Sequence, residues 1–141
     1  MPYLWVTVGS ALGGLLRYAL TRLTLAISAD FPYGTILINV LGSFVIGYVG
    51  TLTLQSGRYA ISDNLRLFVM VGICGGFTTF SSFSLQTFDL LRNGAWGRAM
   101  ANIVVSVVLC LAAVAAGHLI AQQQTARIAI TDAARDHHHL G

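Results

Sequence analysis

The sequence has 141 residues, of which 55% are hydrophobic and only 9% are charged. Soluble domains usually carry about 25% charged residues, so this composition excludes an ordinary soluble protein and indicates a membrane protein of one domain. The net charge of +3 comes from arginines spread along the chain, and this modest excess argues against a nucleic-acid-binding protein.

Four apolar segments are long enough to cross a bilayer, which requires about 20 residues of helix. They comprise residues 3–25, 34–54, 65–91 and 97–121, and they form a predicted membrane domain over residues 1–121. The first segment begins after Pro2, which suits a helix start. Gly9 and Gly13, four residues apart, give it a face for close helix contact.

Two segments carry small polar side chains at successive steps of four residues, which places them on one helix face. In the second segment they are Thr35, Asn39 and Ser43, and in the fourth they are Asn102, Ser106 and Cys110. The two cysteines, Cys74 and Cys110, lie in apolar segments and indicate neither a disulfide framework nor a metal site.

The third segment is charge-free over residues 67–88, yet its middle is a poor helix. The run GICGGFTTF at 72–80 contains three glycines, each costing about 1 kcal/mol of helix propensity relative to alanine. Irregular backbone at this depth is tolerated only where it is buried in protein or lines a watery cavity. We therefore expect a helix break here, and a functional site at the break. The alternative is an ordinary helix packed through small residues.

Two further features concern the ends of the helices. A polar turn is expected at 55–64, with Ser62 or Asp63 capping the third segment. Residues 122–141 are polar and are predicted to form a disordered tail. Its run His137-His138-His139 is interpreted as incidental or introduced rather than as a metal site.

Arginines are divided almost equally between the two predicted membrane faces. One face has Arg58, Arg66, Arg127 and Arg135, and the other has Arg22, Arg92 and Arg98, with Arg17 deeper. Arginine excess normally fixes membrane orientation, so this balance predicts insertion in both orientations and an antiparallel dimer. A single orientation is the alternative.

The predicted helices contain no Asp, Glu or Lys near mid-depth, so they lack a proton carrier, a coupling carboxylate and an activated nucleophile. We therefore expect no enzyme. What remains are neutral hydrogen-bond donors and aromatic rings, whose rims are electropositive. Moving a bare anion into a low dielectric costs on the order of 20 kcal/mol, which such groups can offset along a narrow path. Taken singly, each polar group is also explained by a bond to a neighbouring helix.

Three stretches resemble the Fluc (CrcB-type) family of bacterial fluoride channels: GGLLRYAL, FPYGTILINVLGSFVIG and GICGGFTTFSSFSLQTFDLLRNG. The resemblance covers about residues 9–117. It implies an all-α membrane protein with four transmembrane helices per chain, a broken third helix and a dual-topology antiparallel homodimer. The implied function is passive, selective fluoride export across the bacterial inner membrane, which relieves fluoride toxicity.

Residue roles follow from the same resemblance. Fluoride-pore residues are implied at Asn39, Thr35, Phe80, Phe83, Ser84, Ser106 and Asn102. Many family members have Tyr at the position of Asn102. A structural sodium ion, shared between two subunits, would be held by the backbone carbonyls of Gly75 and Thr78, which agrees with the use of unwound carbonyls in membrane sodium sites. Arg17 is implied in an entry vestibule or as an interface anchor.

Two rival interpretations belong to other classes. A small dual-topology multidrug or cation exporter would resemble its relatives in a membrane-buried Glu in the first helix, which this sequence lacks. A non-transporting membrane assembly subunit would explain the glycine faces, but it would not explain the polar stripes and the helix break together.

Overall fold

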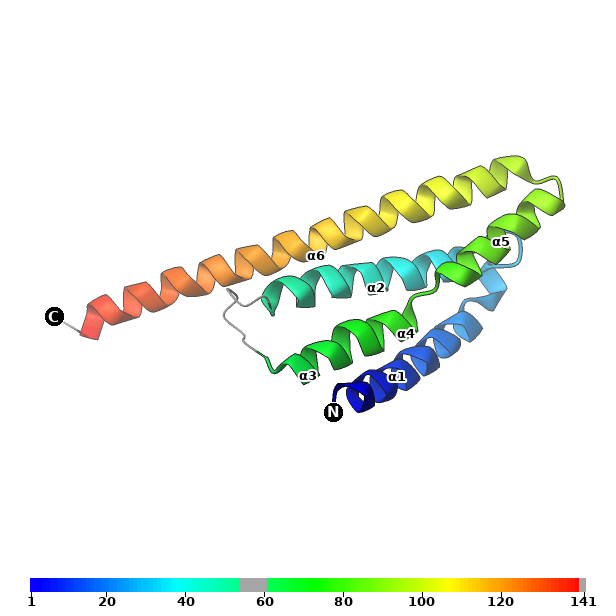
Figure 1. Cartoon of the computed structure of the whole chain (residues 1–141). Helices are drawn as coiled ribbons and strands as arrows, with labels where there is room; N and C mark the ends of the chain where they lie inside the picture. The colour runs from blue at the N-terminus through cyan, green and yellow to red at the C-terminus, as the bar shows by residue number, and fades with distance from the viewer. Residues whose placement is uncertain (54–60, 140–141) are drawn as a thin grey trace.

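The computed structural model describes residues 1–53 and 61–139, and the side chains of residues 1–53 and 61–127. Within these ranges every regular element is helical (Figure 1). The elements are α1 (Pro2–Leu23), η1 (Leu25–Ile27), α2 (Tyr33–Leu52), α3 (Asp63–Arg66), η2 (Leu67–Cys74), α4 (Gly75–Phe77), α5 (Phe80–Arg92) and α6 (Trp96–His139).

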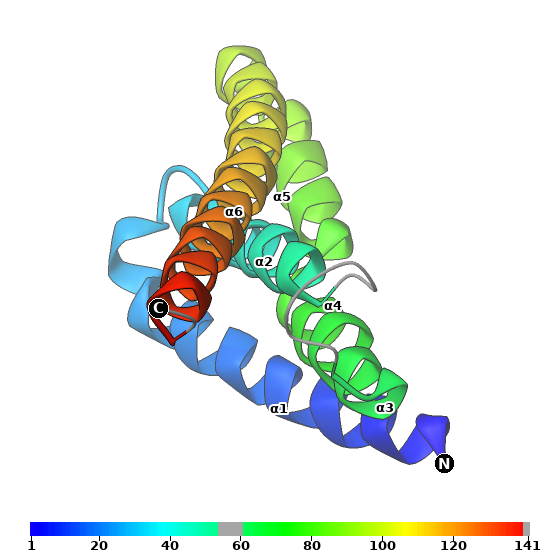
Figure 2. The ribbon, with the colours of Figure 1, turned by 90° about the vertical axis from the view of Figure 1, so that its left-hand side faces the viewer.

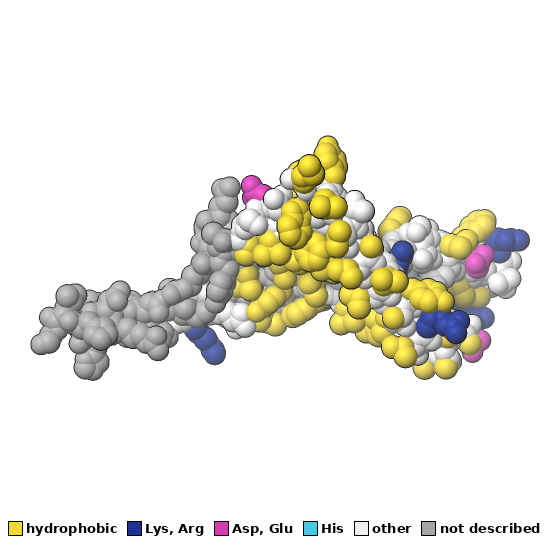
Figure 3. Space-filling model, turned by 90° about the horizontal axis from the view of Figure 1, so that it is seen from below, with side chains coloured by type: hydrophobic (Ala, Val, Ile, Leu, Met, Phe, Trp, Pro, Cys, Tyr) yellow, Lys and Arg dark blue, Asp and Glu magenta, His cyan; other side chains and the backbone are white. Residues whose placement is uncertain are grey.

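Three helical stretches of the described chain are long and apolar enough to cross a membrane: Tyr33–Leu52, Asp63–Arg92 and Trp96–Arg127. On the face shown in Figure 3, hydrophobic side chains cover the middle of the molecule, and most of the coloured charged side chains lie toward its ends. The chain is therefore a multi-pass membrane protein. The sequence predicted four spans. Helix α1, with 22 residues, is long enough to cross a membrane, but it is less apolar than these three stretches and is not among the candidate spans.

Helix α1 lies along the first half of the broken helix, the part formed by η2 and α4 (Figures 1 and 2). Glycines allow the backbones to approach closely. A Cβ added at Gly9 would lie 2.5 Å from Phe68 O and 2.9 Å from Gly72 Cα, and one added at Gly76 would lie 2.6 Å from Ser10 O. The glycine face predicted on the first segment is thus the contact surface with the broken helix.

We expect Gly13→Ala to destabilise the protein by about 1–3 kcal/mol, because the new methyl group would overlap the backbone of Ile73 and lie 2.9 Å from Phe77 N. Gly14→Ala is the matched control, since a Cβ there meets nothing within 4 Å and should be neutral or stabilising. Thermal unfolding of both purified variants in detergent measures the difference. Equal melting temperatures would show that α1 does not depend on this contact.

Helices α2 and α6 form the other close pair. A Cβ added at Gly117 would lie 2.5 Å from Phe44 O and 2.8 Å from Tyr48 N. Beyond this crossing, Tyr48 Oη donates to Gln124 Oε1 over 2.6 Å. The contact between α2 and α6 therefore extends to Gln124, beyond residue 121, where the sequence predicted the end of the last helix.

The predicted end of the last helix near Ala121, and the disordered tail after it, differ from the structure. Helix α6 continues without interruption to His139. Gln, Ala and Arg are good helix formers, and neither Gly nor Pro occurs between Gly117 and Gly141 to stop the helix. Polarity alone therefore did not mark a helix end.

The other predicted boundaries agree with the structure within a few residues. Ser62 caps the third helix, because Leu65 N–H donates to its hydroxyl oxygen over 3.3 Å. Gly94 ends the turn after α5 with φ +71°, a conformation that favours glycine. The expected turn at 55–64 lies mostly outside the described residues.

Candidate functional site

The third predicted span is broken at Thr78 and Thr79. Both residues have extended backbone, with φ −75° and ψ 156° at Thr78 and φ −149° and ψ 105° at Thr79. Before the break, η2 has the wide π-helical turns that often occur at functional sites. The break was predicted within residues 72–80, and it lies in that run, after its glycines. Gly72 and Gly76 instead pack against α1.

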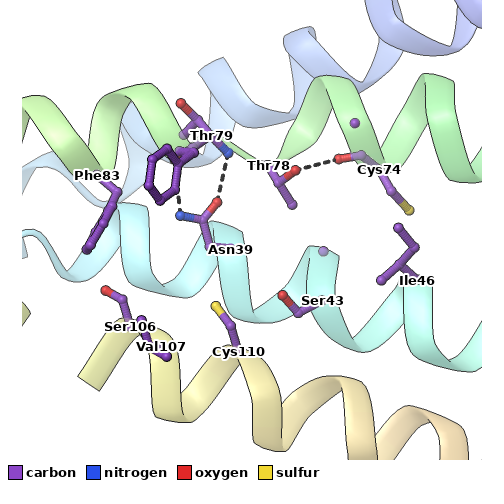
Figure 4. Close-up of a pocket in the computed structure, with 13 residues that line it drawn as sticks. Asn39, Ser43, Ile46, Cys74, Thr78, Thr79, Phe83, Ser106, Val107 and Cys110 are labelled. Atoms are coloured by element: carbon purple, nitrogen blue, oxygen red, sulfur yellow. Dashed lines mark hydrogen bonds between the residues drawn. The ribbon is translucent and has the colours of Figure 1, made fainter. Parts of the chain in front are cut away.

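Asn39 of α2 binds the backbone of Thr79, at the break, with both ends of its side-chain amide (Figure 4). Thr79 N–H donates to Asn39 Oδ1 over 2.8 Å, and Asn39 Nδ2 donates to Thr79 O over 3.2 Å. The first bond gives the Thr79 N–H an acceptor in place of the helical carbonyl that it loses at the break, and the second adds a donor to the Thr79 carbonyl. The Thr79 side chain then caps α5, accepting from Ser82 N–H over 3.2 Å. Asn39 therefore fixes the backbone at the start of α5 to α2.

A cavity of about 340 Å³ opens beside the break. Figure 4 shows side chains from α2, the broken helix and α6 around it. The lining consists of Asn39, Gly42, Ser43, Ile46, Cys74, Gly75, Thr78, Thr79, Phe80, Phe83, Ser106, Val107 and Cys110. Of the described residues that line it, none is charged. Neutral amide, hydroxyl and thiol groups are instead combined with two aromatic rings.

Phe80 and Phe83 lie at the start of α5, immediately after the break. Their ring centroids are 5.4 Å apart, and the ring planes are inclined at 43°. Both rings line the cavity. Ser84 was expected beside them, but its hydroxyl donates to Phe80 O over 2.9 Å and the residue is outside the lining.

The structure separates the two polar residues predicted on the last helix. Ser106 lines the cavity, whereas Asn102 is only 1% exposed and does not reach it. Asn102 Nδ2 donates to Thr87 Oγ1 of α5 over 2.8 Å, and Ser106 Oγ donates to Asn102 Oδ1 over 3.3 Å. These bonds connect α5 with α6 behind the cavity wall.

Six of the predicted site residues thus meet at one cavity: Asn39, Gly75, Thr78, Phe80, Phe83 and Ser106. Four lie outside its lining: Thr35, Ser84, Asn102 and Arg17. Thr35 is half-buried on α2, and Arg17 is half-buried on α1.

Sequence reasoning missed two threonines, Thr79 and Thr87, which are both buried. Thr87 follows Phe83 by one helical turn, so its spacing alone could have placed it near the rings. Thr79 gave no comparable signal, because its partner Asn39 is 40 residues away in the sequence.

The family model described as CrcB-like protein, Camphor Resistance (CrcB), matches residues 4–118. A Methylobacterium radiotolerans protein named fluoride-specific ion channel FluC is 65% identical over 116 residues, covering 82% of this chain and 81% of its own. The protein of the same name from Gluconobacter oxydans is 63% identical over 117 residues, covering 82% and 81%. Another, from Methylocella silvestris, is 55% identical over 122 residues, covering 86% and 93%.

Proposed function

The chain belongs to the CrcB-like family, and on this premise we propose that it forms a passive, selective fluoride channel. The observation that carries the proposal is the uncharged cavity beside the helix break, lined by the Asn39 amide, hydroxyl groups and the rings of Phe80 and Phe83. In the bacterial inner membrane, such a channel lets fluoride leave the cytoplasm down its gradient and so relieves fluoride toxicity.

The physical argument is electrostatic. A small anion loses on the order of 20 kcal/mol of hydration in a low dielectric, and hydrogen-bond donors must replace that hydration along the path. Hydroxyl groups such as that of Ser43 and the rims of phenyl rings offer partial positive charge without holding the ion as a fixed cation would. An ion that is stabilised but not trapped can leave, which conduction requires.

We extend the proposal to an antiparallel homodimer in which α1 is the fourth span of each chain. Phe80 lines the cavity yet is 78% exposed, so its ring lacks a covering surface within one chain. A second copy would cover it and close the cavity. Because arginines are balanced between the two ends, both orientations are available for antiparallel pairing.

A structural sodium ion fits the backbone at the break. Thr79 N–H donates to Asn39, so the Gly75 carbonyl lacks its usual helical donor among the described residues, and extended Thr78 turns its own carbonyl out of the helix. Gly75 is exposed, and even an added Cβ there would meet nothing within 4 Å. Two such pairs of carbonyls at a dimer axis would hold sodium, whose charge would offset their partial negative charges.

Adding lysines to the connection between α2 and α3 is expected to abolish fluoride efflux when the variant is expressed alone. The added positive charge would favour one membrane orientation, so antiparallel partners would be absent. Coexpression with a variant carrying lysines in the Asn93–Ala95 connection should restore efflux. Normal efflux from the first variant alone would contradict the antiparallel dimer.

Efflux from liposomes tests the function itself. Purified protein is reconstituted in vesicles loaded with potassium fluoride or potassium chloride. Anion release is measured after a potassium ionophore is added, which prevents a membrane potential from opposing the efflux. We expect rapid release of fluoride and none of chloride above that of empty vesicles. Equal release of both ions, or fluoride release that requires a sodium or proton gradient, would contradict a selective passive channel.

A further inference from the structure

Three buried polar side chains form a chain of hydrogen bonds that reaches the cavity from behind its wall. Thr87 Oγ1 donates to Phe83 O over 2.7 Å, Asn102 Nδ2 donates to Thr87 Oγ1 over 2.8 Å, and Ser106 Oγ donates to Asn102 Oδ1 over 3.3 Å. All three residues are at least nine-tenths buried. Only Ser106 also lines the cavity.

In this arrangement the Ser106 hydrogen is directed to Asn102 and away from the cavity. A hydroxyl group has a single hydrogen to donate, so Ser106 presents only oxygen lone pairs to an approaching anion. If the hydroxyl turned toward the anion alone, Asn102 Oδ1 would become a buried acceptor without a donor, which is unfavourable. Ser106 can therefore donate to an anion without penalty only if Asn102 Oδ1 finds another donor.

We propose that Asn102 is a positioning residue that turns the Ser106 hydroxyl toward fluoride by reversing its own side-chain amide. This inference rests on the proposed fluoride channel. In the reversed state, Ser106 donates to the anion, Asn102 Nδ2 donates to Ser106 Oγ, and the Thr87 hydroxyl donates to Asn102 Oδ1.

The two states contain the same number of hydrogen bonds. Thr87 gives up its bond to Phe83 O, but that carbonyl keeps its backbone partner because it lies within α5. The bond that Ser106 accepts from Nδ2 polarises its hydroxyl and strengthens its donation to the ion. The reversal thus delivers a donor to the cavity without leaving a buried polar atom of this chain unpaired.

Three substitutions distinguish this role from packing. Asn102→Asp keeps the shape and the acceptor but removes the Nδ2 hydrogens, and Asn102→Leu removes the amide altogether. Fluoride efflux per folded channel should fall about tenfold or more in both. Thr87→Val removes the same bond between α5 and α6 but leaves the amide in place, so it should lower the melting temperature and lose less efflux than Asn102→Leu. Thr7→Val is the control and should conduct normally, because Thr7 is exposed and its hydroxyl donates to the carbonyl four residues earlier, as that of Thr87 does.

The decisive measurement is a double-mutant cycle. If Asn102 acts through Ser106, Asn102→Leu should lower efflux about tenfold in the wild-type background and should cause no further loss in Ser106→Ala. An equal loss in both backgrounds, or wild-type efflux from Asn102→Asp, would overturn the proposed reversal. Wild-type efflux from Ser106→Ala would also overturn it, while leaving the channel intact. A wild-type protein that releases no fluoride would instead contradict the proposed function.

Discussion

Asn39→Asp is expected to abolish fluoride efflux from liposomes. Aspartate keeps the acceptor for Thr79 N–H but, when ionised, has no hydrogen for Thr79 O, which the amide contacts over 3.2 Å. It also places a negative charge in the cavity lining. Two like charges about 4 Å apart repel by about 4 kcal/mol at an effective dielectric constant of 20, which lowers the flux by a hundredfold or more.

Two variants separate the effect of the new charge from the loss of the hydrogen bonds to Thr79. Asn39→Ala removes both hydrogen bonds without adding charge and should retain more efflux than Asn39→Asp. Asn64→Asp makes the same chemical change on α3, outside the cavity lining, and should conduct as the wild type does. Normal efflux from Asn39→Asp would show that Asn39 does not border the ion path.

Phe83→Ile and Phe80→Ile should each reduce fluoride efflux at least about tenfold without unfolding the protein. Isoleucine retains most of the apolar volume but has no electropositive rim to face an anion. Both rings line the cavity at a centroid separation of 5.4 Å, so the loss of either removes part of one aromatic wall.

Phe88→Ile is the matched control, because Phe88 lies on the same helix but outside the lining and is exposed. Efflux per folded protein should stay close to the wild-type value in this variant. If Phe80→Ile and Phe83→Ile also conduct normally, the rings serve packing alone.

The helix break was predicted within residues 72–80 and lies there, but the glycines of that run are not the residues that extend. Three glycines in 72–80 weaken a helix, yet Gly72 and Gly76 remain helical because α1 packs against them. The chain extends instead at Thr78 and Thr79, where Asn39 supplies a replacement acceptor for the Thr79 N–H. A contact across 40 residues has no local sequence pattern, so propensity could not locate it.

The polar residues spaced four apart predicted which side chains share a helix face, but not which of them line the cavity and which pack against another helix. Ser106 and Asn102 are one turn apart on α6, yet only Ser106 reaches the cavity, because α5 crosses α6 where Thr87 covers Asn102. Which part of a stripe is covered depends on helix packing, and the spacing of residues along one helix does not contain that information.

The most direct test of passive, selective fluoride permeation is the reversal potential of the reconstituted protein in a planar bilayer. With a tenfold fluoride gradient and equal chloride on both sides, we expect the current to reverse at the fluoride equilibrium potential, about 59 mV from zero for one charge. This value should not change when sodium or proton gradients are added. A reversal potential near zero, or one that follows an imposed chloride gradient, would contradict a selective fluoride channel.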